Sequence, residues 1–290
     1  PIGENPVKAA INVFMWMEAV IHGKDLGSEH GVQGVERLDN DIKLIYAVAS
    51  NALINQHADI NRTVRILQDE SLVEYIIVQD NFLTPTARFA DLVLPACTQF
   101  ETYGIEDGWK YGDEVLFMPK LVDPPGECKS DYRICAEIAE RLGFGEAYTE
   151  GRNEREWVGW IIEKYRQTYF PDIPTIEEFE TSNIGIYSRP TPNSAVAFAD
   201  FRRDPDAFPL STPSGKIEIF SSQLHALNNP KEIPAIPKYI QEWESPFGLE
   251  AAEYPLQCIG HHTLARVHST HDNNDWLQEA FPQRVFINPL

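Results

Sequence analysis

The sequence predicts an α/β protein that opens with a doubly wound αβα domain and continues into a mixed helical and loop-rich segment. Two observations favour this class. Short apolar stretches rich in β-formers alternate with amphipathic stretches of helical spacing over residues 1–148. That alternation then stops, and a proline-rich region follows. We therefore place boundaries that separate residues 1–148, 149–250 and 251–290.

The first elements follow from apolar spacing. A helix is expected over residues 9–22, where apolar side chains recur close to helical spacing. Residues 42–49 are apolar on both faces, which is typical of a parallel strand covered by helices on each side. Asp59 can cap the next helix, whose apolar face ends near Asp69.

Two more strands are expected in the same domain. Residues 74–79 form the second, and Thr84 with Pro85 is typical of a helix start, here of a short helix over residues 86–90. The third strand covers residues 92–94 and is followed directly by a proline.

A loop is then expected to run to residue 127. Ser130 or Asp131 can cap the helix that follows, and Gly143 closes it. This β-α-β-α-β succession predicts a Rossmann-like, doubly wound domain.

Beyond residue 148 the periodicity is weaker. A helix is expected around Trp157 and Trp160, whereas residues 216–221 alternate polar and apolar side chains as a half-exposed strand does. Two further strands, residues 254–260 and 284–287, are expected on either side of a last helix. That helix covers residues 274–280.

Composition excludes several classes of protein. The chain has 290 residues, of which 43% are hydrophobic and 23% charged, so a packed core is expected rather than disorder or a coiled coil. The 24 Lys and Arg against 44 Asp and Glu give a net charge of −20, which repels a polyphosphate backbone. Nucleic acid is therefore not expected as a partner.

The cysteines and the chain ends are also informative. The four cysteines form no CxxC pair, so they are expected as thiols rather than as metal ligands or a disulfide framework. No apolar run is long enough to span a bilayer. The chain begins at Pro1 and stops within a strand-like stretch, so we expect a piece of a longer protein.

Polar side chains follow the first two predicted strands. Ser50, Asn51 and Asn55 come after the first, and Gln79 and Asp80 after the second. In open α/β sheets, ligands bind outside the carboxyl ends of the strands, so these residues are expected to lie close together at a site.

The carboxylate of Asp80 could accept the N1–H and the exocyclic amine of a guanine, which adenine cannot reproduce. Alternatively, Asn51 and Asp80 only end strands or cap helices. Asp131 has the same structural alternative, as an N-cap.

Four of the eight histidines lie between residues 260 and 271. A closed metal shell is not expected there, because His261 and His262 would face opposite ways on a strand and no carboxylate or cysteine sits at zincin-like spacing. The loop is instead dense in donors suited to an anionic or heterocyclic ligand, unless it is simply an exposed polar loop. No GxGxxG, GxxxxGK[ST] or GxSxG motif occurs, and no catalytic constellation is complete, so no catalytic or metal-ligating residue is assigned.

Several segments together resemble the molybdopterin oxidoreductases of the dimethyl sulfoxide reductase type, in particular the catalytic chains of the anaerobic, membrane-anchored reductases. The resemblance covers nearly the whole chain. The residues that carry it are 49–62, 77–80, 86–95, 127–131, 149–152, 201–209, 211–220 and 267–270.

This resemblance implies a molybdenum enzyme that removes the oxygen atom of a sulfoxide in anaerobic respiration. Its cofactor would be bis-molybdopterin guanine dinucleotide with molybdenum, and a 4Fe–4S cluster would be bound by an amino-terminal region not present here. Residues 1–148 would hold one guanine dinucleotide, and residues 251–290 would open a carboxyl-terminal β-barrel domain. This piece alone is expected to be inactive.

The resemblance also implies roles for single residues. Asn51 and Asn55 would line the nucleotide pocket, Asp80 would contact the guanine or ribose, and Asp131 would close the pocket. Thr102 stands where relatives often carry a basic residue. The residues that match the loop approaching the pterin are His262, Arg266, His268, Ser269 and Thr270.

Partners and location are implied in the same way. The full enzyme would dock on an iron–sulfur electron-transfer subunit and a membrane anchor subunit, would be extracytoplasmic or periplasmic, and would act on a small sulfoxide or N-oxide. A non-catalytic αβα nucleotide-binding or scaffold protein without molybdenum is the alternative.

Overall fold

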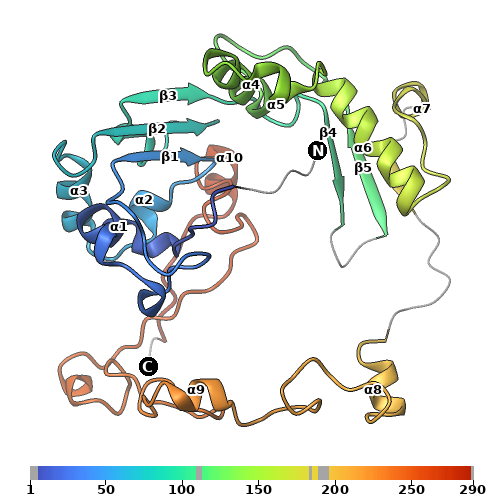
Figure 1. Cartoon of the computed structure of the whole chain (residues 1–290). Coiled ribbons are helices and arrows are strands. Elements are labelled where there is room, and N and C mark those ends of the chain that lie inside the picture. The colour runs from blue at the N-terminus through green and yellow to red at the C-terminus, as the bar shows by residue number, and fades with distance from the viewer. Residues whose placement is uncertain (1–5, 109–112, 183–184, 189–195, 289–290) are drawn as a thin grey trace. The chain divides into compact units, whose positions relative to one another are not determined.

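The structure is a computed structural model that describes residues 6–108, 113–182, 185–188 and 196–288 (Figure 1). The chain divides into two compact units, Pro1–Ser194 and Ala195–Leu290. The boundaries proposed at residues 148 and 250 stay predictions. In the described part of the chain, none of the helices combines the length and the apolar character needed to cross a bilayer.

A parallel sheet of three strands lies in the first unit. Its strands are β1 (Leu44–Val48), β2 (Tyr75–Asp80) and β3 (Leu92–Pro95), in that order. Val48 pairs with Gln79, and Asp80 pairs with Pro95, so all three strands end at one edge. The predicted α/β class and all three predicted strands are confirmed.

Helices and 3₁₀ turns precede β1 and connect the three strands. They are η1 (Val13–Met15), α1 (Trp16–His22), η2 (Gly23–Asp25), η3 (Ser28–His30), α2 (Ala52–Asn55), α3 (Ile60–Leu67) and η4 (Ala87–Phe89). The predicted cap of α3 is confirmed, because the Asp59 carboxylate accepts the amide of Arg62 at 3.0 Å. The Thr84 hydroxyl accepts the amide of Ala87 at the predicted helix start, although that turn is 3₁₀ rather than α-helical. The first helix is α-helical only from Trp16.

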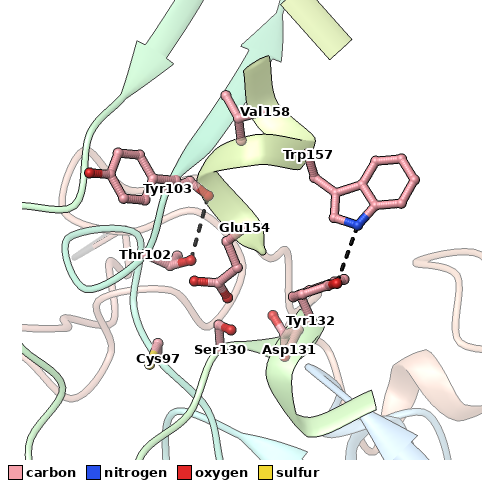
Figure 2. A pocket seen from close by; sticks show the side chains of 9 residues that line it. All are labelled: Cys97, Thr102, Tyr103, Ser130, Asp131, Tyr132, Glu154, Trp157 and Val158. Atoms are coloured by element: carbon pink, nitrogen blue, oxygen red, sulfur yellow. Dashed lines mark hydrogen bonds between the residues drawn. The ribbon is translucent and has the colours of Figure 1, made fainter. Parts of the chain in front are cut away.

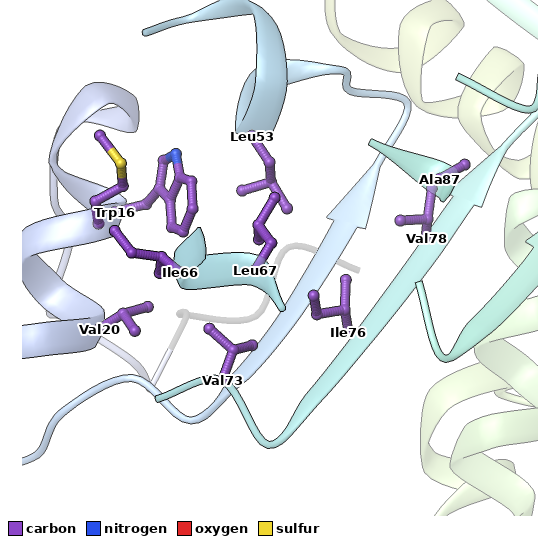
Figure 3. Close-up of a cluster of buried hydrophobic side chains, with 10 residues drawn as sticks. Trp16, Val20, Leu53, Ile66, Leu67, Val73, Ile76, Val78 and Ala87 are labelled. Atoms are coloured by element: carbon purple, nitrogen blue, oxygen red, sulfur yellow. The ribbon is translucent and has the colours of Figure 1, made fainter. Parts of the chain in front are cut away.

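The core of the parallel sheet lies on one of its faces (Figure 3). Ile76 and Val78 point into it from β2, and Trp16, Val20 and Ile66 cover them from α1 and α3. With the strand order β1-β2-β3, right-handed crossovers place both connections on this same face.

The expectation of helices over both faces is confirmed only in part. On the other face, Gln79 is 1% exposed and donates a hydrogen bond to Asp131 of α4 (Asp131–Arg141), but much of the rest of that face is open. Leu44, Val48 and Tyr75 on the other face are 55%, 48% and 42% exposed.

Residues 96–127 were expected as a loop, and this is wrong. They contain β4 (Gly104–Asp107) and β5 (Glu114–Met118), which pair antiparallel, and β5 also pairs with β6 (Ile186–Ser188). The helices of this region are α4 (Asp131–Arg141), α5 (Gly145–Thr149), α6 (Glu154–Thr168) and α7 (Ile176–Ser182). Phe117 of β5 stacks on Phe179 of α7 at 5.2 Å between ring centroids, in a second core shared with α6.

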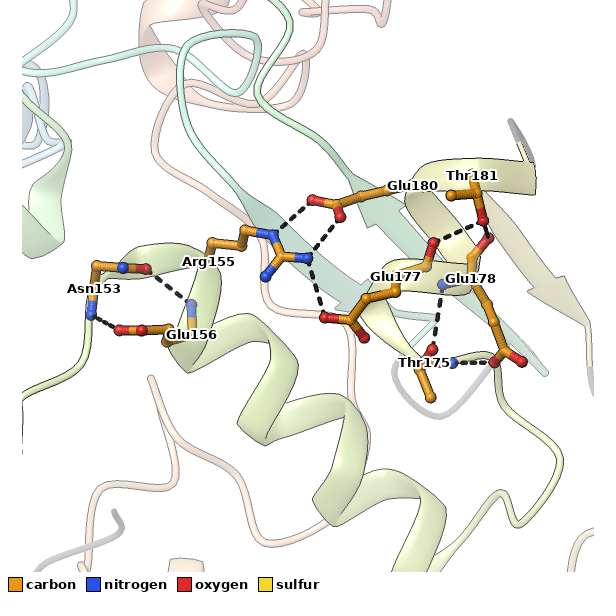
Figure 4. Close-up of polar contacts among 8 residues, drawn as sticks. All are labelled: Asn153, Arg155, Glu156, Thr175, Glu177, Glu178, Glu180 and Thr181. Atoms are coloured by element: carbon orange, nitrogen blue, oxygen red, sulfur yellow. Dashed lines mark hydrogen bonds and ion pairs between the residues drawn. The ribbon is translucent and has the colours of Figure 1, made fainter.

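An ion-pair cluster joins α6 to α7 (Figure 4). The Arg155 guanidinium donates to both carboxylate oxygens of Glu180, at 2.8 and 2.6 Å, and to Glu177 at 3.1 Å. The Asn153 side chain caps α6 by accepting the amide of Glu156 at 3.0 Å, and Glu156 accepts the amide of Asn153 in return at 2.8 Å. The first turn of α6 is thus held both by its capping residues and by the ion pairs of Arg155 with α7.

The second unit contains α8 (Ala199–Arg203), α9 (Ser222–Ala226), η5 (Leu249–Ala252) and α10 (Asp275–Ala280). The predicted last helix is confirmed. The strands predicted over residues 216–221, 254–260 and 284–287 are wrong, since the described residues there form no strand, and the expected opening of a barrel has no counterpart in residues 251–288. Ile217 and Ile219 are each 74% exposed, so the alternating pattern has no partner strand to pack against.

Candidate functional site

The carboxyl edge of the parallel sheet brings the ends of β1 and β2 together, as predicted. Ala49 adopts a left-handed conformation (φ 47°) directly after β1, and its amide donates to the Gln79 carbonyl at 2.9 Å. The Ser50 hydroxyl then accepts the amide of Ala52 at 3.1 Å. This turn holds the loop after β1 against the end of β2.

Asn51 ties the loop after β1 to the loop after β2. Its Oδ1 accepts the Thr86 amide at 3.0 Å and the Thr86 hydroxyl at 2.9 Å, and Thr86 is fully buried. The side chain does not cap α2, although Asn51 occupies the N-cap position. Asn55, the last residue of α2, is exposed.

Gln79 is almost fully buried at this edge, with 1% exposure. Its Nε2 donates to Asp131 Oδ1 at 2.5 Å, and its Oε1 accepts the hydroxyl of Tyr46. Burial raises the pKa of Tyr46, and nearby Cys135 and Asp131 raise it further, so the hydroxyl stays protonated and able to donate. A chain of hydrogen bonds therefore runs from β1 through β2 to the start of α4.

Asp131 is the first residue of α4 but not its cap. The Ser130 hydroxyl caps the helix by accepting the amide of Arg133 at 3.1 Å. Of the two candidate caps, Ser130 is therefore the one used. The carboxylate of Asp131 is left for Gln79 and for the pocket beside it.

Asp80 ends β2 on the side of the sheet that carries Ile76 and Val78. Its Oδ1 accepts the amide of Phe82 at 3.1 Å, which closes the turn after the strand. Asp80 is only partly buried.

A pocket of about 250 Å³ opens beside Asp131 (Figure 2). It lies where the first turns of α4 and α6 meet the segment that leads into β4. Figure 2 shows the Glu154 carboxylate directed between Thr102 and the Ser130–Asp131 pair. The residues that line the pocket are Cys97, Thr102, Tyr103, Ser130, Asp131, Tyr132, Glu154, Trp157 and Val158.

Glu154 is the unusual group of this pocket. Its Oε1 is buried and accepts no hydrogen bond from the described residues. Burial raises the pKa of Glu154, and Asp131 acts in the same direction, while the Thr102 hydroxyl, Lys120 and Arg133 oppose the increase.

Aromatic residues form the remaining wall. Trp157 Nε1 donates to the Tyr132 hydroxyl at 3.2 Å, and that hydroxyl donates to the Arg152 carbonyl. The Arg152 guanidinium lies 4.6 Å from the centre of the Trp157 ring. Both rings are thereby held in place beside the carboxylates.

Apart from the exposed Asn55, the predicted site residues of the first unit thus fall into two groups. Ser50, Asn51, Gln79 and Asp80 lie at the sheet edge, and Gln79 links this edge to Asp131. Thr102 lies in the same pocket as Asp131.

The remaining predicted residues, His262, Arg266, His268, Ser269 and Thr270, belong to the second unit. There the Arg266 guanidinium pairs with Asp272 at 2.6 Å, Val267 pairs with Thr270 in an isolated bridge, and His268 adopts a left-handed conformation (φ 52°).

Sequence reasoning missed Tyr46, Tyr132, Glu154 and Trp157. The Asn153–Glu156 capping pattern could have placed Glu154 at a helix start. Nothing in the sequence shows that α4 and α6 begin side by side.

The site combines a parallel sheet, polar side chains at its carboxyl edge, and a pocket lined by carboxylates and aromatic rings. These features define an α/β protein with a candidate ligand site near the ends of its strands.

Comparisons with known proteins identify the family. Residues 5–141 match the family model described as molybdopterin oxidoreductase. The whole chain is 41% identical to dimethyl sulfoxide reductase DmsA of Haemophilus influenzae and 40% identical to dimethyl sulfoxide reductase DmsA of Escherichia coli, covering 37% and 36% of those proteins. Over 84% of its length it is 38% identical to the dimethyl sulfoxide/trimethylamine N-oxide reductase of Cereibacter sphaeroides.

The chain belongs to the molybdopterin oxidoreductase family, and it spans about a third of the length of the curated relatives it matches. A solved structure agrees on the fold. Acetylene hydratase from Pelobacter acetylenicus matches 93% of this chain and 32% of its own with a TM-score of 0.61, at 23% identity.

The family implies a molybdenum–pterin cofactor, and the residues of the pocket fit part of such a group. The unpartnered Glu154 oxygen, the Asp131 carboxylate and the aromatic wall suit a planar group that donates hydrogen bonds, as the base of a nucleotide does. No group of three or more His, Cys, Asp or Glu side chains gathers as a metal site in the part of the chain that the structure describes. The described residues therefore fit the organic part of such a cofactor.

Proposed function

We propose that this chain holds the nucleotide portion of a molybdopterin guanine dinucleotide in a molybdenum reductase for sulfoxides of the dimethyl sulfoxide type. The observation that carries the proposal is the hydrogen-bond chain Tyr46–Gln79–Asp131. It fixes a carboxylate at the carboxyl edge of a parallel sheet, beside a pocket.

The role of these residues is to bind and orient the nucleotide. Asn51 and Ser50 stiffen the two edge loops, and Gln79 holds Asp131 in one orientation, so little ordering remains to be done when a ligand binds. The loop containing Arg266 and His268 would supply donors near the pterin, as the family resemblance implies. None of these residues is proposed to move a proton in the reaction.

When bound, the cofactor would supply oxygen-atom transfer chemistry, in which a sulfoxide, two electrons and two protons give a sulfide and water. The second guanine dinucleotide and a 4Fe–4S cluster would be bound by other parts of the parent protein. The relatives named for dimethyl sulfoxide and trimethylamine N-oxide reduction support this substrate class.

We also propose that the parent enzyme receives electrons from an iron–sulfur subunit, is attached to the membrane through an anchor subunit, and works outside the cytoplasm. Reconstituting sulfoxide reduction in isolated membranes, with and without each subunit, tests this assembly. Reduction that depends on neither subunit would contradict it.

Calorimetric titration of the chain with GDP and ADP tests the proposed binding role. Saturable binding of GDP but not ADP is expected, and Asp80→Ala tests whether Asp80 contributes. The alternative of a scaffold without nucleotide predicts that the folded chain binds neither.

A further inference from the structure

The pocket at the start of α4 and α6 has an unusual charge arrangement. Each helix begins with an acidic residue, Asp131 in α4 and Glu154 in α6, and both carboxylates line the cavity. Helix N-termini stabilise negative charge, and here the protein's own carboxylates already occupy that place. A phosphate or another anion would therefore be repelled from this pocket.

One carboxylate oxygen of Glu154, Oε1, has no donor among the described residues, although the Thr102 hydroxyl favours the charged form of the carboxylate. This oxygen is buried, and an unsatisfied buried acceptor is costly. A metal ion is a poor candidate, because no three metal-binding side chains converge in the described chain. A neutral molecule with adjacent N–H groups satisfies the acceptor without adding charge.

The size and shape of the cavity limit the kind of ligand that it can hold. The cavity of about 250 Å³ lies below the usual range of about 300–1,000 Å³ for small-molecule sites, so it suits one base rather than a dinucleotide. Tyr132 and Trp157 contribute flat apolar surface to its lining, and Trp157 is fixed by its bond to the Tyr132 hydroxyl.

We propose that Glu154 is a guanine-specificity residue whose buried oxygen, together with Asp131, accepts the N1–H and the 2-amine of the base. This inference rests on the proposed nucleotide-binding function and assigns the base to the pocket rather than to Asp80. The Asp80 carboxylate already accepts the Phe82 amide at 3.1 Å, and Asp80 does not line this cavity. Adenine has an acceptor at N1, and hypoxanthine lacks the 2-amine, so both lose a hydrogen bond here.

Calorimetry with GMP, IMP and AMP tests the assignment on the chain and on Glu154→Gln. The chain is expected to prefer GMP to IMP by about tenfold or more, as one hydrogen-bonded contact to a base predicts. Glu154→Gln keeps one side-chain acceptor but replaces the other carboxylate oxygen with an NH₂ donor, so it should lower GMP affinity by about tenfold or more and abolish the preference over IMP. Glu163→Gln, at an exposed position of the same helix, is the matched control and should bind as the parent chain does.

The outcomes separate this inference from the proposed function. Unchanged GMP affinity in Glu154→Gln, with loss in Asp80→Asn, would overturn the inference and leave the function standing. A folded chain that binds no guanine nucleotide would overturn both.

If Glu154→Gln does not fold, two other measurements decide. Equal affinity of the unsubstituted chain for GMP, IMP and AMP would overturn the inference. Photolabelling with 8-azidoguanosine monophosphate is expected to mark residues 131–158, and labelling confined to residues 80–86 would overturn it.

Discussion

The Gln79 side chain donates a hydrogen bond of 2.5 Å to the carboxylate of Asp131, although the two residues lie 52 positions apart. This bond connects the end of a central strand to the first turn of α4. The side-chain oxygen Oε1 of Gln79 accepts a hydrogen bond from the Tyr46 hydroxyl at the same time. The orientation of a candidate ligand-binding carboxylate is therefore set by the parallel sheet.

Gln79→Ala should destabilise the chain by roughly 1–3 kcal/mol, because the substitution removes two side-chain hydrogen bonds and the packing of a buried side chain. Urea denaturation followed by circular dichroism measures the loss. Gln99→Ala, at an exposed position, is the control. If the two variants unfold at the same urea concentration, the Tyr46–Gln79–Asp131 chain contributes no stability.

The Asn51 side chain stabilises the fold by accepting two hydrogen bonds from Thr86. Substitution by alanine and substitution by aspartate should therefore lower the stability by different amounts. Asn51→Ala leaves the buried Thr86 amide and hydroxyl unsatisfied and should cost roughly 1–3 kcal/mol. Asn51→Asp keeps an acceptor at the same place and should recover most of that loss. Thermal unfolding of the two variants checks this, and equal destabilisation would contradict the proposed bonds.

Arg155 should stabilise the packing of α6 on α7. Its hydrogen bonds to the Glu180 carboxylate hold the pKa of that group below its ordinary value. Because both side chains are partly exposed, Arg155→Ala should cost only about 1 kcal/mol. The contribution should fade as the pH drops through the lowered pKa of Glu180 and the carboxylate becomes protonated.

Comparing the urea midpoint of Arg155→Ala with that of the parent chain near neutral pH and at about pH 3 measures both effects. Asp123→Ala, which removes a highly exposed ion-pair partner of Lys120, is the control. A stability difference that does not change between the two pH values would argue against the Arg155–Glu180 pairing.

Glu154 should affect the pH dependence of stability in the direction opposite to that of Glu180. Because burial raises its pKa above the ordinary 4.5, the folded state binds the proton more tightly than the unfolded state. The stability of the parent chain relative to Glu154→Gln should be greatest below about pH 4.5 and should fall as the pH rises through the raised value.

Thermal unfolding of both chains at several pH values between about 4 and 7 measures this trend. Glu163→Gln controls for the loss of a carboxylate from the same helix. A constant difference between the parent chain and Glu154→Gln would show that the carboxyl group titrates alike in the folded and unfolded chains.

Local sequence signals predicted the parallel sheet well. Residues 42–49, 74–79 and 92–94 are rich in apolar β-forming side chains, and Asp59 and Ser130 cap helices through bonds to nearby amides. The β4–β5–β6 sheet was missed. Only its third strand is distant along the chain, since Leu116 of β5 pairs with Ile186 in the short strand β6, whereas β4 and β5 pair locally. Residues 216–221 show the reverse case, because an alternating pattern without a partner strand does not form a strand.

The candidate site was predictable only in part. Strand ends identified Asn51, Gln79 and Asp80, since parallel strands end at a common edge. The pocket depends instead on the meeting of two helix starts, which places Glu154 beside Asp131. The contact between these two helix starts results from tertiary packing, so no residue spacing in the sequence predicts it.

The most direct test of the nucleotide-binding account is the cofactor content of the parent enzyme after Asp131→Ala. Molybdenum and acid-released GMP are measured per protein chain, with Glu140→Ala, exposed on the same helix, as the control. The account predicts that Asp131→Ala loses most of both, while the control retains them. A folded Asp131→Ala enzyme with full molybdenum and GMP content would contradict it.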